Sequence, residues 1–381
     1  MGGGHSNIPR SKVIIVGGGY IGVEVAIKLD KHCDVTVIDP QDALHHKIAS
    51  LRATVVPGWE KRLRIPLTNL LKNGKVLHDE VTSVSETTVT LKSGTSLTAD
   101  FIILAHGGGP SNFPCGPLDG VTDSSKLVAV AKEKQGLISA AQTILIVGGG
   151  PVGVEMAGEI KAHHPTKTVH LVHSHDSLLN NSTPPILPTA TMKLTELLKE
   201  QGVIVHLGVK VSDMPVVESR DAFVNVPKSY TLSDGTQITA DMTIVTTGPP
   251  PTARPAPIID AIDDRGHVKV NSYLQVEGYT KVFCVGDANN WPETKLALTG
   301  KNQAAQVVKN LLAQRDNKPM RVYKGLESQE YGSMSVPVGP RHGVTALNGS
   351  MLGNRATKII KSKGLFSKAT FESVGATLPA V

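Results

Sequence analysis

The sequence predicts an α/β protein built from two similar units with parallel sheets, followed by a small α+β segment at its C-terminal end. Two pairs of repeats lead to this prediction. The stretches VIIVGGGYIGVEVAI (13–27) and ILIVGGGPVGVEMAGEI (144–160) are nearly alike, and so are LKSGTSLTADFIILAHG (91–107) and LSDGTQITADMTIVTTG (232–248). The first pair is offset by 131 residues and the second by 141, which indicates that a whole unit is duplicated.

Each glycine-rich stretch predicts a buried strand, a tight turn and a helix. The runs Val13–Val16 and Ile144–Val147 are apolar and rich in β-branched residues, as are strands buried on both faces of a parallel sheet. The glycines that follow are spaced G-x-G-x-x-G, which permits the turn, the approach of a pyrophosphate and close packing of the helix. They are Gly17, Gly19 and Gly22 in the first copy and Gly148, Gly150 and Gly153 in the second. Because a helix start attracts phosphate, each copy predicts a dinucleotide site.

The two copies differ at the end of their second strand. DVTVIDP places Asp39 22 residues beyond Gly17, where a carboxylate accepts the hydroxyls of an adenosine ribose. TVHLVHSH places His173 in the corresponding position, 25 residues beyond Gly148. His173 does not repel a 2′-phosphate, so the second site accepts NADPH as well as NADH. Two dinucleotides in one chain favour electron transfer between them, with FAD and NAD(P)H as the usual pair.

Composition narrows the function classes. The net charge of +6 suits anionic ligands or a membrane surface but is mild for a nucleic-acid binder. The three cysteines, Cys33, Cys115 and Cys284, include no two within five residues, which argues against a thiol-based disulfide reductase and for a reducing compartment. His170, His173 and His175 lie close in sequence without an acid or thiol to complete a ligand set, so we expect no metal site.

Four stretches together carry a resemblance to a known family. They are GGGPVGVEMAGEIKAHHPTKTVHLVHS, HHKIASLRATV, NSYLQVEGYTKVFCVGD and KSKGLF. With them the chain resembles the apoptosis-inducing-factor-like NAD(P)H:quinone oxidoreductases, the ferroptosis suppressor protein family, within the two-dinucleotide-binding-domain flavoproteins. The resemblance extends from residue 1 to about residue 372.

The resemblance implies a role for individual residues. The FAD pyrophosphate is lined by Gly17, Gly18, Gly19, Tyr20 and Ile21. Arg52 contacts FAD, Val81 touches its adenine and Asp287 holds its ribitol. Glu155 lies near the nicotinamide and the flavin, whereas Lys361 and Phe366 lie beside the isoalloxazine, where a quinone binds. The chain departs from the family at Ala105-His106-Gly107, where the usual sequence is Ala-Thr-Gly.

The domain organisation follows from two Gly- and Pro-rich joints, 107–123 and 248–257. Beyond the second joint, a buried strand at Val282–Val285 precedes Asp287, and a helical pattern begins at about Leu298. We therefore expect four parts. They are the first part of an FAD-binding domain (1–115, with 1–10 as a flexible N-terminal anchor), an NAD(P)H-binding domain (116–247), the second part of the FAD-binding domain (248–315) and a C-terminal segment that covers the flavin (316–381).

Two charged residues are candidates for the reaction, each with a simpler alternative. Glu155 faces the nicotinamide in the family, but a glutamate near a helix start, like Glu24 in the first copy, is often only favourable to the helix dipole. Lys295 precedes the helix whose start points at the flavin, where a cation stabilises the anionic reduced ring. The alternative for Lys295 is a solvated surface lysine.

These observations predict an FAD-dependent enzyme that passes hydride from NAD(P)H through FAD to a quinone. A ferredoxin- or rubredoxin-reductase-like flavoprotein is an alternative enzyme of the same fold. A second alternative is a death effector that binds DNA, like apoptosis-inducing factor itself. Clustered basic residues would support it, but apart from 355–368 the basic residues are spread along the chain.

The N-terminal residues MGGGHSN match the pattern M-G-x-x-x-[ST], which predicts myristoylation at Gly2; the alternative is a flexible glycine-rich leader. A single myristoyl chain binds membranes only marginally, so a second signal is needed. The basic segment RATKIIKSKGLFSK (355–368) is a candidate, unless it is an ordinary solvated basic face. We therefore expect a cytoplasmic protein attached peripherally to membranes or lipid droplets.

Overall fold

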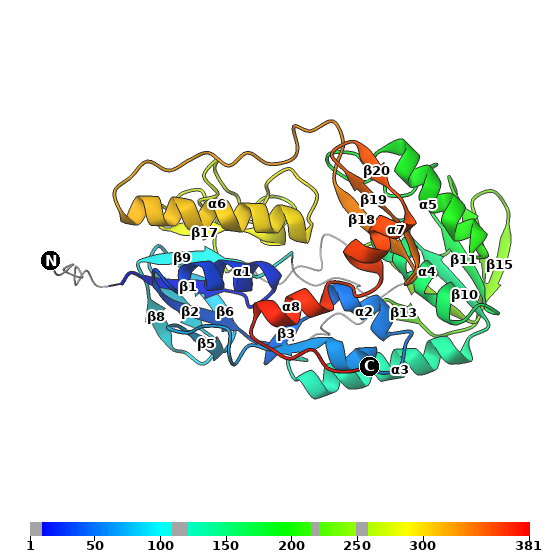
Figure 1. Ribbon diagram of the computed structural model, residues 1–381, viewed down its shortest axis with the longest axis horizontal. Coiled ribbons are helices and arrows are strands. Elements are labelled where there is room, and N and C mark those ends of the chain that lie inside the picture. Colours follow the sequence, from blue (N-terminus) through cyan, green and yellow to red (C-terminus); the bar gives the residue numbers. More distant parts are fainter. Residues whose placement is uncertain (1–9, 109–120, 215–220, 249–257) are drawn as a thin grey trace.

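The computed structural model describes residues 10–108, 121–214, 221–248 and 258–381. Two units lie side by side, each containing a five-stranded sheet, and the C-terminal segment packs against both (Figure 1). This is the predicted α/β architecture with a smaller α+β segment. Gly2 and Cys115 lie outside the described residues.

The first unit is organised by a wholly parallel sheet of order β17-β9-β1-β2-β5. Val16 is in register with Ile38 and with Leu104, so β1, β2 and β9 end at one edge and their following loops meet there. Helices α1 and α6 pack against each other beside this sheet. The bounds are β1 (Lys12–Val16), β2 (Asp34–Asp39), β5 (Lys75–His78), β9 (Phe101–Leu104), β17 (Val282–Cys284), α1 (Tyr20–Leu29) and α6 (Ala297–Arg315).

Smaller elements complete the first unit. The predicted hairpin before β9 is present, because β7 pairs antiparallel with β8, and β6 joins them as a third strand. A second small sheet, β3 with β4, leads into α2. The bounds are β6 (Val81–Val84), β7 (Thr88–Leu91), β8 (Ser96–Thr98), β3 (Ala43–His45), β4 (Arg64–Pro66), α2 (Lys47–Ala53) and the 3₁₀ turns η1 (Trp59–Arg62) and η3 (Gly286–Ala288).

The second unit repeats the design with the order β12-β11-β10-β16-β13, in which only β13 runs antiparallel. Val147 is in register with Val172 and with Val245, so the loops again meet at one edge. The predicted hairpin is formed by β14 and β15. The bounds are β10 (Thr143–Val147), β11 (Thr168–Val172), β12 (Val203–His206), β13 (Phe223–Val224), β14 (Lys228–Thr231), β15 (Gln237–Ala240), β16 (Met242–Val245), α3 (Ser124–Ala140), α4 (Pro151–His163) and α5 (Pro188–Glu200).

The C-terminal segment connects the two units. Val336 and Val344 of its sheet belong to the apolar core of the second unit, whereas Phe371 and Val374 pack into the core of the first. A left-handed backbone at Leu365 and Phe366 turns the chain between these two contacts. The bounds are β18 (Met334–Val338), β19 (His342–Leu347), β20 (Ser350–Leu352), α7 (Asn354–Thr357), the π-helical turn η4 (Lys358–Ser362) and α8 (Ser367–Ser373).

Among the described residues, no helix combines the length and the apolar character needed to cross a membrane.

His46 joins the first unit to the C-terminal segment. Its Nδ1 lies 2.6 Å from Tyr20 Oη and its Nε2 lies 3.2 Å from Ser367 Oγ at the start of α8. The side chain is fully buried, and this burial lowers the pKa of His46 from 6.5 to about 4. The imidazole is therefore neutral in the folded protein at neutral pH.

This buried histidine predicts a loss of stability in acid. As pH falls below 6.5, His46 becomes protonated in the unfolded chain, whereas in the folded protein it stays neutral until about pH 4. Acid therefore stabilises the unfolded chain relative to the folded protein. A difference of this size corresponds to about 3 kcal/mol of folding free energy, fully lost below pH 4. Chemical denaturation between pH 7 and 4 should therefore give a flatter profile for His46→Asn than for the unmodified protein. The exposed His175, changed to Asn, is the control, and equal slopes for all three proteins would contradict the assignment.

Candidate functional site

A cavity of about 1640 Å³ opens between the two units and the C-terminal segment. A single small ligand occupies roughly 300–1000 Å³, so this cavity has room for more than one. Its walls include most of the residues predicted for the site. These are Gly17, Gly18, Gly19, Tyr20, Ile21, Asp39, Val81, Glu155, Asp287, Lys295, Lys361 and Phe366.

The glycines of the first loop serve two separate purposes. A Cβ on Gly22 would lie 1.9 Å from Gly17 O, so the helix packs against the loop only because this residue is glycine. Gly17 has a φ of 110° and touches the backbone of Ala105, which also excludes a side chain. A Cβ on Gly19, by contrast, would meet nothing within 4 Å. Protein packing therefore does not require glycine at 19, whereas a ligand that approaches the backbone would.

The second loop shows the same division. A Cβ on Gly153 would lie 1.9 Å from Gly148 O, whereas one on Gly150 would meet nothing within 4 Å. Gly19 and Gly150 are also the N-cap residues of α1 and α4, and neither helix has a side-chain cap or an acid in its first turn. The first N–H groups and the positive dipole end of both helices are thus available to a phosphate. Both loops fit a dinucleotide pyrophosphate.

Asp39 and His173 brace their loops in the same way. Asp39 Oδ2 accepts the N–H of Gly18 at 2.5 Å, and His173 Nδ1 accepts the N–H of Gly149 at 3.1 Å. Nε2 of His173 then carries the proton and donates to Asn180 Oδ1 at 3.0 Å. Burial lowers the pKa of His173, which keeps the ring neutral. The loop is therefore held by the acid Asp39 in the first unit and by the neutral imidazole of His173 in the second. The predicted contacts of these two residues with a nucleotide remain predictions.

Glu155 and Lys361 form an ion pair in the cavity wall. Lys361 Nζ donates to Glu155 Oε1 at 2.7 Å and to Ser335 O at 3.1 Å. Burial raises the pKa of Glu155, and the charge of Lys361 opposes that rise. Glu155 is the fifth residue of α4, beyond the first turn in which the helix dipole acts. The simpler alternative, a glutamate that only favours the helix start, therefore does not describe it.

Lys295 is not a solvated surface lysine. Its Nζ donates to Asn289 O at 2.9 Å, Asn289 Oδ1 at 3.2 Å and Trp291 O at 3.0 Å, just before α6. Burial lowers the pKa of Lys295, and the negative charge of Asp287 acts in the opposite direction. These carbonyl contacts fix a cation beside the cavity, near the start of a long helix.

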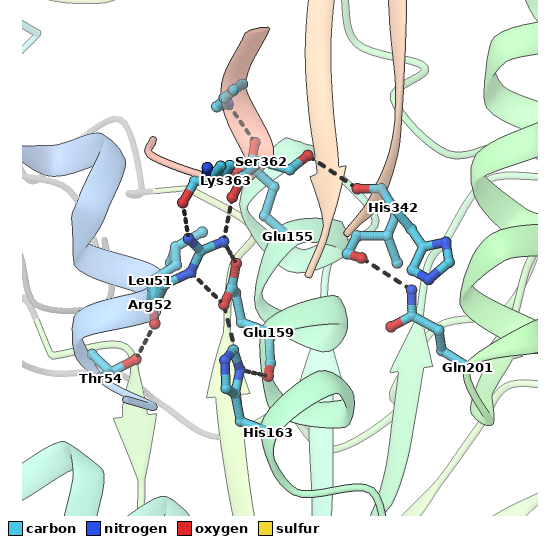
Figure 2. Close-up of polar contacts among 12 residues, drawn as sticks. Leu51, Arg52, Thr54, Glu155, Glu159, His163, Gln201, His342, Ser362 and Lys363 are labelled. Atoms are coloured by element: carbon cyan, nitrogen blue, oxygen red, sulfur yellow. Dashed lines mark hydrogen bonds and ion pairs between the residues drawn. The ribbon is translucent and has the colours of Figure 1, made fainter. Parts of the chain in front are cut away.

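The structure places Arg52 away from the cavity wall, apart from most of the other predicted site residues. Its guanidinium does not line the cavity but is buried against Glu159 of α4 and the backbone of η4 (Figure 2). The side chain of Arg52 is only 2% exposed, so its hydrogen-bonding groups face protein atoms. These groups contact α4 and the C-terminal segment, and the predicted contact between Arg52 and FAD remains a prediction.

Several cavity residues carry no signal in the sequence. Ser335, Thr345 and Ile360 line the cavity because β18, β19 and η4 fold over it, and no motif marks them. His106 also lines the cavity, next to the end of β9. The sequence does mark this residue, because it lies in the Ala105-His106-Gly107 departure from the family and at the carboxyl end of a parallel strand, where ligands bind in such sheets.

Comparison with known proteins places the chain among oxidoreductases. It matches the family described as pyridine nucleotide-disulphide oxidoreductase over residues 3–55 and 45–309. It is 32% identical to apoptosis-inducing factor homolog B of Dictyostelium discoideum, covering 94% of this chain and 95% of that protein. It is also 32% identical to ferroptosis suppressor protein 1 of Taeniopygia guttata, covering 97% of each.

The fold is similar to that of solved structures with little sequence identity. The sulfide:quinone oxidoreductase of Aquifex aeolicus superposes with a TM-score of 0.71 at 15% identity, covering 96% of this chain and 91% of that one. At this identity the likeness concerns the fold alone.

Proposed function

Because the chain belongs to the pyridine nucleotide-disulphide oxidoreductase family, among the apoptosis-inducing-factor-like proteins, we propose that it passes hydride from NAD(P)H through FAD to a quinone. The chain is an oxidoreductase that binds FAD and NAD(P)H. The proposal adds three parts to this: the identity of the acceptor, the assignment of each cofactor to one unit, and the attachment to a membrane.

The assignment of cofactors rests on the differences between the two units. Asp39 and Asp287 both line the cavity beside the first glycine loop, which favours FAD there, with its ribose and ribitol hydroxyls as donors to the carboxylates. The second loop has the neutral His173 in place of an acid, which suits either form of NAD(P)H. When bound, FAD supplies the chemistry of accepting a hydride and passing on two electrons. The protein supplies the fixed cation of Lys295 near the ring.

The observation that carries the proposal is the contact between Glu155 and Lys361. Glu155 comes from the unit assigned to NAD(P)H, and Lys361 comes from the C-terminal segment. Their 2.7 Å hydrogen bond lies in the wall of the cavity that also contains the first glycine loop. The pair thus joins the unit assigned to NAD(P)H to the C-terminal segment, and it would fix charge beside the groups between which the hydride passes.

The lining of the cavity favours a quinone over other acceptors. The C-terminal segment contributes Met334, Ala346, Leu347, Ile360 and Phe366, an apolar surface that suits a lipid-soluble ring. A disulfide acceptor within the chain is disfavoured, because both described cysteines are buried free thiols. A DNA-binding role is disfavoured because it would leave two dinucleotide sites without a use, and the basic residues outside 355–368 are spread along the chain.

The acceptor is tested by steady-state oxidation of NADH and NADPH. With a short-chain ubiquinone we expect turnover at least about tenfold faster than with a ferredoxin, because only the small apolar ring enters the cavity. Faster turnover with ferredoxin would favour the ferredoxin-reductase alternative and overturn the quinone proposal.

Glu155→Gln should keep FAD but slow reduction of the flavin by NAD(P)H. The amide cannot form the ion pair, so Lys361 loses its fixed position, and we expect a decrease of roughly 10- to 100-fold. Stopped-flow absorbance measures the rate. Glu196→Gln, which changes an exposed glutamate of α5 outside the cavity lining, is the control and should reduce normally. If both variants reduce at the unmodified rate, Glu155 has no part in the reaction.

Membrane attachment is the second part of the proposal. Around the cavity, Leu347, Ile360 and Phe366 are exposed, and the neighbouring Ile359 is 84% exposed. The exposed basic residues Arg355, Lys358, Lys363 and Lys368 lie in the same segment. Each basic residue near an anionic leaflet contributes about 1 kcal/mol, and the apolar side chains add burial in the interface. This face supplies the second signal that a myristoyl group at Gly2 requires.

Fractionation of cells that contain N-myristoyltransferase tests the attachment. The unmodified protein should sediment with membranes or lipid droplets, whereas Gly2→Ala and Ile359→Glu should each shift it toward the soluble fraction, because a single signal binds only marginally. Exposed Ile204 of the second unit, changed to Glu, is the control and should not shift. Equal distribution of all four proteins would refute the anchor but not the redox proposal.

A further inference from the structure

Arg52 joins three parts of the chain through four hydrogen bonds. Its Nε and one terminal nitrogen donate to the two carboxylate oxygens of Glu159 at 2.9 and 2.6 Å. Its terminal nitrogens also donate to Ser362 O at 2.7 Å and to Lys363 O at 3.1 Å. Arg52 lies on α2, Glu159 on α4, and the two carbonyls are at the end of η4, as Figure 2 shows. Arg52, which belongs to the first unit, thus links that unit to the second unit and to the C-terminal segment.

The geometry of this cluster is tightly fixed. The side chains of Arg52 and Glu159 are 2% and 3% exposed, and the ring of Trp59 covers the guanidinium at 4.7 Å. A buried ion pair costs desolvation, and apolar residues of similar volume often give equal or greater stability. Stability alone is therefore a poor reason for this pair. A planar guanidinium with four fixed partners does specify orientation, which apolar contacts specify less sharply.

The cluster is directly connected to the ion pair in the cavity wall. Glu159 is one helical turn beyond Glu155 on α4, so the two carboxylates lie on the same face. Ser362, whose carbonyl Arg52 holds, follows Lys361 in the chain. The turn itself is closed by a hydrogen bond from Leu365 N–H to Lys361 O at 2.7 Å. Both members of the Glu155–Lys361 pair are therefore attached, within one turn, to partners of Arg52.

We propose that Arg52 is a positioning residue, which holds the η4 turn against α4 so that Lys361 Nζ reaches Glu155 in the cavity wall. Arg52 touches no residue of the reaction directly through its own guanidinium but fixes the backbone from which Lys361 extends. The inference rests on the proposed function only in that the Glu155–Lys361 pair faces the reacting groups.

Hydrogen–deuterium exchange of the purified flavin-containing protein tests the positioning without any turnover. Arg52→Met removes the four hydrogen bonds but keeps an unbranched side chain, so exchange in residues 358–366 should rise at least about tenfold. Arg52→Lys keeps the charge without the planar fork and should give an intermediate increase. Lys134→Met, which breaks the partly buried ion pair with Asp221 in the second unit, is the control and should leave 358–366 unchanged.

Stopped-flow reduction of the flavin by NAD(P)H tests whether positioning reaches the reaction. Arg52→Met should lower the limiting rate by about 10- to 100-fold, as misplacement by about 1 Å does, with little change in the nucleotide concentration for half-maximal rate. In the double variant with Lys361→Met, the loss should equal that of Lys361→Met alone, because both changes remove the same contact. Lys134→Met should reduce at the unmodified rate.

Two results would overturn the proposal. One is unchanged exchange in 358–366 for Arg52→Met, and the other is a loss of rate in the double variant that equals the product of the two single losses. If Arg52→Met does not fold, Glu159→Gln makes the same test, because it removes the charge and one acceptor with little change of volume. Failure of the proposed function is distinguishable, since both measurements omit the acceptor. The effect of Arg52 on exchange and on flavin reduction can therefore be measured whether the protein prefers ferredoxin or ubiquinone.

Discussion

The close contact between each glycine loop and the helix that follows it is the constraint on which the site depends. Gly22 and Gly153 each bring a helix so near the preceding turn that any Cβ would overlap a carbonyl oxygen. The helix start is thereby held at the edge of the sheet where β1, β2 and β9, or their counterparts, all end. For this reason the N–H groups of the helix start, the residue at the end of the second strand and the loop after β9 or β16 gather in one place.

The two units use this common design with different charge. Asp39 brings a carboxylate to the first loop, whereas His173 braces the second loop as a neutral ring. The duplicated backbone therefore offers a pyrophosphate the same support in both units, but the two units differ in the side chain offered to the rest of the dinucleotide. Discrimination between two dinucleotides requires only such a difference at the strand end, without any change in the turn or the helix.

Much of the fold was predictable from the sequence because its signals are local. The β-branched runs, the glycine spacing and the hairpin before the last strand of each unit all act within about thirty residues. The contacts of Arg52 with Glu159 and with Ser362 span 107 and 310 residues, and no periodic pattern reports contacts of that kind. The same is true of Ser335 and Ile360, whose place in the cavity depends on how the C-terminal segment crosses both units. The family resemblance pointed to both Lys361 and Arg52, but a motif does not report the residues around them, such as Glu159 beside Arg52.

The position of β17 has a consequence for the order in which the protein is made. This strand, Val282–Cys284, completes the first sheet beside β9, which ends at Leu104. A ribosome must therefore synthesise the entire second unit before the first can close its sheet, and at roughly 5–20 residues per second this takes about ten to forty seconds. During that interval the edge of β9 has no partner, which is the condition that invites pairing with other chains. The nascent first unit is thus a natural client for chaperones, whereas all strands of the second sheet are made in one stretch, between Thr143 and Val245.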